Sequence, residues 1–151
     1  MILSVHFAAG AALSTVIHEP AILAPTAMIL HIALDVFPHW EYEFMGIPKL
    51  QAAVKIAVDV FAGVLCVVLL SQGTSFDHLA LALWGGFFGI LPDGITFLYL
   101  LSKKKLFPRF TRMHIFFHTL IIPENEHPPA WLGIITQSAV IALCIFALLP
   151  R

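Results

Sequence analysis

Charged residues are scarce in this chain. Asp, Glu, Lys and Arg make up only 11% of its 151 residues, whereas hydrophobic residues make up 60%. Soluble domains have about a quarter charged residues. So few charges argue against a soluble monomer, and disorder is excluded because it requires low hydrophobicity and high charge. We therefore expect a single integral membrane domain over residues 1–151.

A large excess of one charge sign, the features of a cleaved signal peptide and closely spaced cysteines are also missing. The formal net charge is −1, so nothing draws the chain to nucleic acid. No basic stretch opens the chain and no small-residue cleavage site follows, which indicates a retained first segment. The two cysteines, Cys66 and Cys144, lie inside apolar runs without Cys-x-x-Cys spacing. They are expected to pack as small hydrophobic residues, and a zinc knuckle is not supported.

Long apolar runs are what the chain has instead. They cover residues 2–17, 21–36, 56–71, 79–101 and 131–149. A helix needs about 20 residues to cross the hydrocarbon. The first two runs are short for this and are joined by a His18-Glu19-Pro20 turn, which predicts a hairpin-like pair. We expect an all-α polytopic membrane bundle with about five membrane helices, plus a cytoplasmic amphipathic helical segment within residues 103–129.

Basic residues predict the orientation of this bundle. Those that follow the fourth run or precede the third are Lys103, Lys104, Lys105, Arg109, Arg112, Lys49 and Lys55. The positive-inside rule places both loops in the cytoplasm. The N-terminus is then inside and Arg151 outside, and we expect the bacterial inner membrane as the location. The basic run after the fourth helix is also a candidate contact for anionic lipids.

Histidine and aspartate carry the chemistry. His31, Asp35 and His39 are spaced four apart, so the first two share a helix face, while Pro38 places His39 just beyond the helix end. His114 and His118 have the same spacing. Two such side chains on one helix can hold a divalent metal, and ionisable groups within membrane helices are functional candidates because they are costly there.

The predicted topology brings these groups together. His6, His31, Asp35, His39, His114 and His118 all fall near the cytoplasmic face. Asp93 lies deeper, after Pro92, which is expected to break the fourth helix. His18, His78, Glu19 and Asp77 fall on the other face. Less specific interpretations remain for His6 as a packed histidine, and for His114 and His118 as a polar stripe on an interfacial helix.

Four segments together resemble known proteins. They are His6-Phe7-Ala8-Ala9-Gly10-Ala11-Ala12, His31-x-x-x-Asp35-x-x-Pro38-His39-Trp40-Glu41-Tyr42, Gly89-Ile90-Leu91-Pro92-Asp93 and Phe116-Phe117-His118. The chain resembles a group of small bacterial integral membrane proteins and, more distantly, the YdjM-like membrane-bound metal-dependent hydrolases. The resemblance covers residues 6–118, and the segment 31–42 is its most specific part.

The resemblance implies a metal site formed by His6, His31, Asp35, Asp93, His114 and His118. The chain departs from the family pattern in two ways. Gly94-Ile95-Thr96 stand where the family often has a second Asp and a His, and the His-x-x-x-Asp element precedes Leu-Pro-Asp instead of following it. These departures argue against a two-metal site.

Two functions are consistent with these residues. The first is a cytoplasm-facing divalent-metal site in a metal-dependent hydrolase that acts on a phosphoester or lipid-type substrate, since a metal lowers the pKa of water toward neutrality. Zinc is the expected metal, with manganese or iron as alternatives. His31, Asp35, His114 and His118 would be ligands, Asp93 a ligand or general base, and His39 a ligand or the acid for the leaving group.

The second function is a non-enzymatic membrane protein. Its His/Asp cluster would be a structural metal site or a hydrogen-bond network, and the missing second Asp favours this interpretation. Haem binding and transport remain open. No histidine pair is singled out for haem, and a transporter usually needs more helices or an oligomer.

Overall fold

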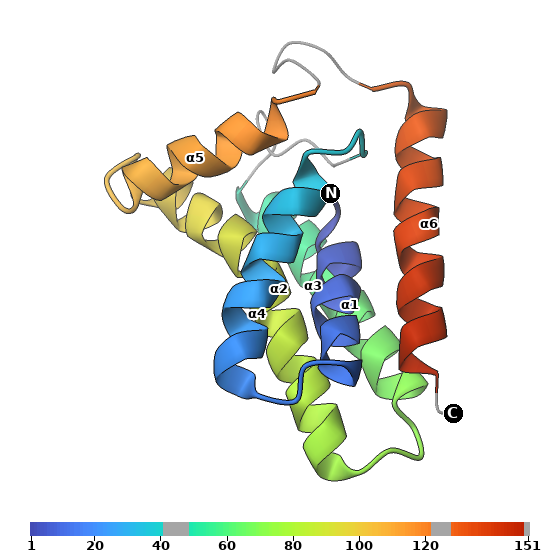
Figure 1. Cartoon of the computed structure of the whole chain (residues 1–151). Coiled ribbons are helices and arrows are strands. Elements are labelled where there is room, and N and C mark those ends of the chain that lie inside the picture. Colours follow the sequence, from blue (N-terminus) through green and yellow to red (C-terminus); the bar gives the residue numbers. More distant parts are fainter. Residues whose placement is uncertain (41–48, 122–127, 150–151) are drawn as a thin grey trace.

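All regular structure in the described residues is helical (Figure 1). The structure is a computed structural model and describes residues 1–40, 49–121 and 128–149. Its α-helices are α1 (Leu3–Ala12), α2 (Pro20–Asp35), α3 (Lys49–Leu70), α4 (Phe76–Leu101), α5 (Pro108–His118) and α6 (Ala130–Leu148). The predicted all-α class is thereby confirmed for this part of the chain. Glu41, Tyr42 and Arg151, named in the sequence predictions, lie outside it.

Three of these helices are long and apolar enough to cross a membrane. They are Leu50–Leu70, Phe76–Leu101 and Ala130–Leu148. Helices α1 and α2 are apolar but shorter, and they run side by side in opposite directions, joined by a 3-10 turn and a short connection (Figure 1). The structure therefore supports three crossing helices by length and composition and does not establish the count of about five.

Close packing of α1 on α4 fixes the centre of the bundle. Gly10 faces Gly85 and Gly89 across this contact. A Cβ on Gly10 would lie 2.3 Å from the Gly85 carbonyl oxygen, and one on Gly89 would lie 2.5 Å from the His6 carbonyl oxygen. Only residues without a side chain allow backbones to approach this closely. The contact holds His6 of α1 beside the middle of α4.

The start of α1 is anchored by side chains from two other helices. The Asp59 carboxylate of α3 accepts hydrogen bonds from the backbone N–H groups of Leu3, at 2.6 Å, and Ser4, at 3.2 Å. The Gln137 side chain of α6 accepts one from Ile2 at 3.3 Å. The first N–H groups of a helix have no partner within it, and a carboxylate there also complements the helix dipole. These bonds therefore hold the beginning of α1 in place.

Helix α4 corrects one expectation, because it is not broken at Pro92. It runs unbroken from Phe76 to Leu101 with Pro92 inside it. Proline removes one helical hydrogen bond, but neighbouring helices in a bundle compensate for such losses, and Pro92 is buried. Asp93 therefore projects from a continuous helix.

Helix α5 returns across the end of the bundle at which α2 and α4 terminate (Figure 1). The connection before it contains three residues in the left-handed region, Lys103, Lys104 and Phe107, with φ of 55°, 67° and 55°. Such conformations are unfavourable for residues with a side chain. They reverse the chain tightly enough for α5 to pack against α4 and α2. The cluster of basic residues in this segment therefore lies at the same end of the molecule as the end of α2.

Candidate metal centre

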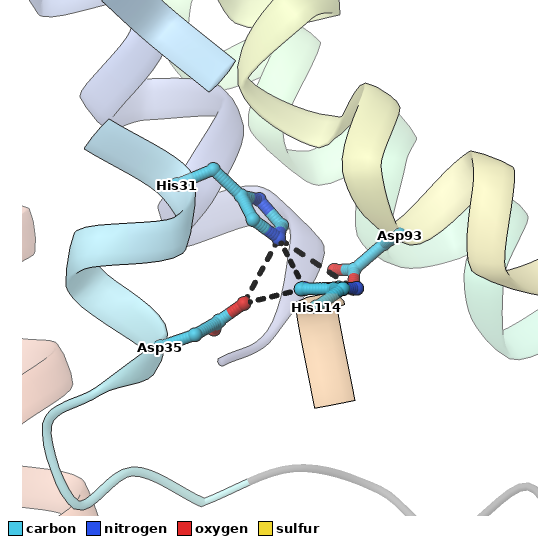
Figure 2. Close-up of side chains that lie close together, drawn as sticks. All are labelled: His31, Asp35, Asp93 and His114. Atoms are coloured by element: carbon cyan, nitrogen blue, oxygen red, sulfur yellow. Dashed lines mark hydrogen bonds and ion pairs between the residues drawn. The ribbon is translucent and has the colours of Figure 1, made fainter. Parts of the chain in front are cut away.

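Asp35 is the centre of the candidate site. Its side chain is fully buried, and imidazoles from three helices and one loop surround it. Figure 2 shows His31, Asp35, Asp93 and His114 pointing toward one another from α2, α4 and α5. A buried carboxylate is unfavourable unless charges or hydrogen bonds compensate it. The sequence separates these residues by up to about 80 positions, and the fold brings them into direct contact.

Four side chains form the tightest group. Nε2 of His31 and Nε2 of His114 each lie 2.9 Å from Oδ2 of Asp35, and they lie 3.1 Å from each other. Oδ1 of Asp93 lies 3.6 Å from His31 Nε2 and 3.8 Å from His114 Nε2. His31 and His114 are almost completely buried, at 1% and 2% exposure. Asp93 is more accessible, with 28% of its side chain exposed.

Outer hydrogen bonds orient both imidazoles. Nδ1 of His31 lies 2.7 Å from the carbonyl oxygen of Gly89, which can only accept a hydrogen bond. That nitrogen must therefore carry the proton, and in a neutral ring Nε2 is left with a lone pair. The hydroxyl of Thr96 lies 2.9 Å from Nδ1 of His114 and can accept a hydrogen bond in the same way. Such outer partners are typical of histidines that bind metal.

The spacing of these four atoms suits a bound ion. Two ligands at 2.0–2.1 Å from one tetrahedral zinc ion lie about 3.3 Å apart. The distances that join the two imidazole nitrogens to each other and to the two carboxylate oxygens range from 2.9 to 3.8 Å. With both Nδ1 atoms protonated, neutral imidazoles direct lone pairs at each other and at carboxylate oxygens. A cation at the centre removes this repulsion, so the residues fit a divalent metal.

A second group shares Asp35 with the first. Nε2 of His39 lies 3.8 Å from Oδ1 of Asp35, and Nε2 of His118 lies 3.5 Å from Oδ2. The two imidazole rings meet edge to face, with centroids 4.8 Å apart. The donor atoms of this group also lie within 4.8 Å of one another. His39 stands just beyond the end of α2, as Pro38 predicts.

Two contacts hold the segment that carries His39. Its Nδ1 donates a hydrogen bond to the carbonyl oxygen of Phe37 at 2.7 Å, which leaves Nε2 facing Asp35. Gly133 of α6 packs so closely on this segment that a Cβ on it would lie 2.6 Å from the backbone nitrogen of Trp40. Burial lowers the pKa of His39 to about 4, and the positive charge of the Met1 amino group acts in the same direction. The imidazole is therefore neutral at pH 7.

His6 reaches Asp35 from the opposite side. Its Nε2 donates a hydrogen bond to Oδ1 at 3.0 Å, and its ring stacks on that of His31 with centroids 3.8 Å apart. The amino group of Met1 also lies 3.1 Å from Oδ1. His6 belongs to neither group of converging donor atoms among the described residues. Its geometry is that of a residue that positions Asp35 and His31.

The other two histidines among the described residues lie away from this site. His18 and His78 line a pocket at the far end of the bundle, between the turn after α1 and the turn after α3. His78 is exposed and contacts the Ser75 hydroxyl at 3.0 Å. This separation agrees with the sequence prediction that these two residues lie on the other face.

Sequence reasoning missed the outer partners. The Gly89 carbonyl and the Thr96 hydroxyl come from α4, whereas the imidazoles that they hold come from α2 and α5. A backbone carbonyl carries no signal in the sequence. Thr96, one turn from Asp93, also gives no sign of this role in the sequence, because its partner His114 lies on α5. The spacing within one helix predicts which residues share a face, but not the partner across a helix contact.

The fold and the cluster define a class: a helical protein with three helices able to cross a membrane and a buried His/Asp group that could hold a metal ion. Comparison of the chain with protein-family models, curated proteins and solved structures gives no match.

Proposed function

We propose that this protein is a membrane-embedded, metal-dependent hydrolase whose active site faces the cytoplasm. One observation carries the proposal: Nε2 of His31, Nε2 of His114 and Oδ2 of Asp35 converge within 2.9–3.1 Å of one another in a buried site. Two imidazoles and one carboxylate would fill three coordination positions of a tetrahedral ion. The fourth position would be left for water or substrate, as in catalytic metal sites. Zinc is the metal that we expect, and manganese and iron also suit such ligands.

The residues divide into ligands and a proton carrier. His31, His114 and Asp35 would hold the ion, which supplies Lewis acidity and lowers the pKa of water. Asp93 lies farther from both imidazoles, at 3.6 and 3.8 Å, and its side chain is 28% exposed. It is therefore best placed beside the open position, where it would accept a proton as the general base.

The surroundings favour a phosphoester or lipid-type substrate. The site lies at the end of the bundle that carries α5 and the basic segment Lys103 to Lys105 with Arg109 and Arg112. Under the positive-inside rule this end faces the cytoplasm, at the level of the lipid headgroups. Exposed Phe107 and Phe116 in the same segment suit an interfacial position. An anionic substrate would meet positive charge on its way to the site.

Metal content tests the proposal first. Detergent-purified protein should contain a near-stoichiometric transition metal by elemental analysis, and Asp35→Asn should lose it, because the amide keeps the shape of the side chain but not its charge. His78→Ala, at the far end, should retain the metal. Hydrolysis of bis(p-nitrophenyl) phosphate, and phosphate release from vesicles containing phosphatidic acid, should follow the metal. A metal-free wild type that stays folded after metal is supplied would leave a hydrogen-bond network as the function of the cluster. Metal without any turnover would leave a structural metal site.

A further inference from the structure

The carboxylate of Asp35 has imidazoles on both of its oxygens, and only one set is used by the metal site proposed above. His31 and His114 lie 2.9 Å from Oδ2. His39 lies 3.8 Å from Oδ1, and His118 lies 3.5 Å from Oδ2. We infer that Asp35 bridges two metal ions, the second held by Asp35, His39 and His118. This inference rests on the proposed metal site and extends it to a two-metal centre.

The second set of ligands would leave one coordination position of its ion open. Two imidazoles and one carboxylate oxygen, all within 4.8 Å of one another, give three protein ligands. His39 is oriented by its hydrogen bond to the Phe37 carbonyl, which directs Nε2 toward Asp35. His118 is the more accessible ligand, with 22% of its side chain exposed. The second position would therefore lie nearer to solvent than the first.

The charges around Asp35 are compatible with two ions. Oδ1 of Asp35 now meets positive charge from the Met1 amino group at 3.1 Å. A second ion would take over that role. Paired metals in hydrolases lie about 3.5–4 Å apart, a separation that one bridging carboxylate spans. Asp93 and Asp35 together supply two negative charges to offset the ions.

This arrangement differs from the expectation drawn from the sequence. The family resemblance argues against a second metal, because Gly94, Ile95 and Thr96 stand where the family often has a second Asp and a His. The structure offers a second ligand set from other places, the segment after α2 and the last residue of α5. Thr96 itself supports His114 instead of binding a metal. The ligands of the second ion are therefore supplied by tertiary contacts.

Manganese titration of metal-stripped, detergent-purified protein tests the inference. We expect two equivalents of Mn²⁺ to bind the wild type by elemental analysis. The paramagnetic resonance signal should grow with the first equivalent and weaken with the second, because ions that share a carboxylate couple magnetically. His39→Ala and His118→Ala should each bind one equivalent and keep the uncoupled signal. His78→Ala should bind two.

The outcomes separate the two proposals. No metal in the folded wild type would overturn both. One equivalent in the wild type, without any loss of signal on further addition, would overturn the two-metal centre and leave the single site. Two equivalents that persist in both His39→Ala and His118→Ala would also overturn the assignment of these ligands. The wild-type titration decides the number of ions even if a variant fails to fold.

Discussion

At the scale of single residues, the outer hydrogen bonds of the imidazoles matter as much as the ligands. The Thr96 hydroxyl lies 2.9 Å from Nδ1 of His114. Thr96→Val keeps the shape and removes the acceptor. We expect metal affinity to fall about 10- to 100-fold, the usual cost of losing such a partner. Competition with a fluorescent zinc chelator measures this affinity. The matched control is Thr136→Val in α6, whose hydroxyl donates a hydrogen bond to the Leu132 carbonyl of the same helix.

A substitution of Asp93 tests whether this residue acts as the general base or as a metal ligand. Asp93→Asn removes a proton acceptor next to the open position but no ligand of the inner three. We expect metal content to stay near the wild-type level while turnover falls about 100- to 10,000-fold, the range that general acid–base catalysis contributes. Elemental analysis and the phosphodiester assay on the same preparation measure both. Loss of the metal together with turnover would make Asp93 a ligand and leave the base unassigned.

At this scale the sequence predicted the members of the cluster but not their partners. The spacing of His31 and Asp35 and of His114 and His118 follows from the helical period, and all four side chains meet. The contact of His6 with Asp35 depends on how α1 crosses α2 and α4, which no periodicity encodes. The same holds for the Gly89 carbonyl.

At the scale of helices, the glycine contact between α1 and α4 links packing to the site. A Cβ on Gly89 would lie 2.5 Å from the backbone oxygen of His6, which cannot move aside. Gly89 also supplies the carbonyl that orients His31. We expect Gly89→Ala to lower the free energy of unfolding by about 1–3 kcal/mol, as overpacking does, and to weaken metal binding.

Gly94 is the control for this prediction, because it lies on the same helix with nothing within 4 Å of an added Cβ. Gly94→Ala should raise the stability by about 0.5–1 kcal/mol, since alanine favours a helix interior over glycine. Thermal unfolding in detergent, followed by helical circular dichroism, compares the two variants. Equal melting temperatures for both would remove the close contact as the constraint on α1.

The helix boundaries show what hydropathy can and cannot predict. The runs 79–101 and 131–149 match α4 and α6 closely because Asp93 is the one charged residue that they contain. The run that begins at residue 56 missed the first turns of α3, which starts at Lys49 and includes Lys55. Polar residues at a helix end continue the helix but interrupt an apolar run. Pro92 wrongly predicted a break in the fourth helix, because packing within a bundle compensates for the hydrogen bond that proline removes.

At the scale of the whole molecule, the bundle has two unlike ends. The metal-ligand candidates, α5 and its basic residues lie at one end, and the turns that carry His18 and Gly73 lie at the other (Figure 1). The basic residues predicted an orientation without reference to the histidines, and the fold gathers both at the same end. A site for a cytoplasmic substrate requires that this end face the cytoplasm.

Cysteine labelling tests this orientation. With Cys66 and Cys144 replaced by alanine, single cysteines would be introduced by Gln72→Cys in the turn after α3 or by Lys104→Cys before α5, both at exposed positions. A membrane-impermeant maleimide applied to intact bacterial cells should label the Gln72→Cys protein. It should label the Lys104→Cys protein only after the inner membrane is permeabilised, because the positive-inside rule keeps that loop in the cytoplasm.

The pair of positions makes the outcome decisive. Labelling of the Lys104→Cys protein alone in intact cells would reverse the orientation and place the Asp35 cluster on the outer face, where a cytoplasmic substrate could not reach it. Labelling of both would show that α4 does not cross the membrane, although it is long enough to do so. Metal binding by purified protein would survive either result, since it depends on contacts within the bundle. The orientation thus decides which substrates the centre meets, and the geometry around Asp35 decides what it can bind.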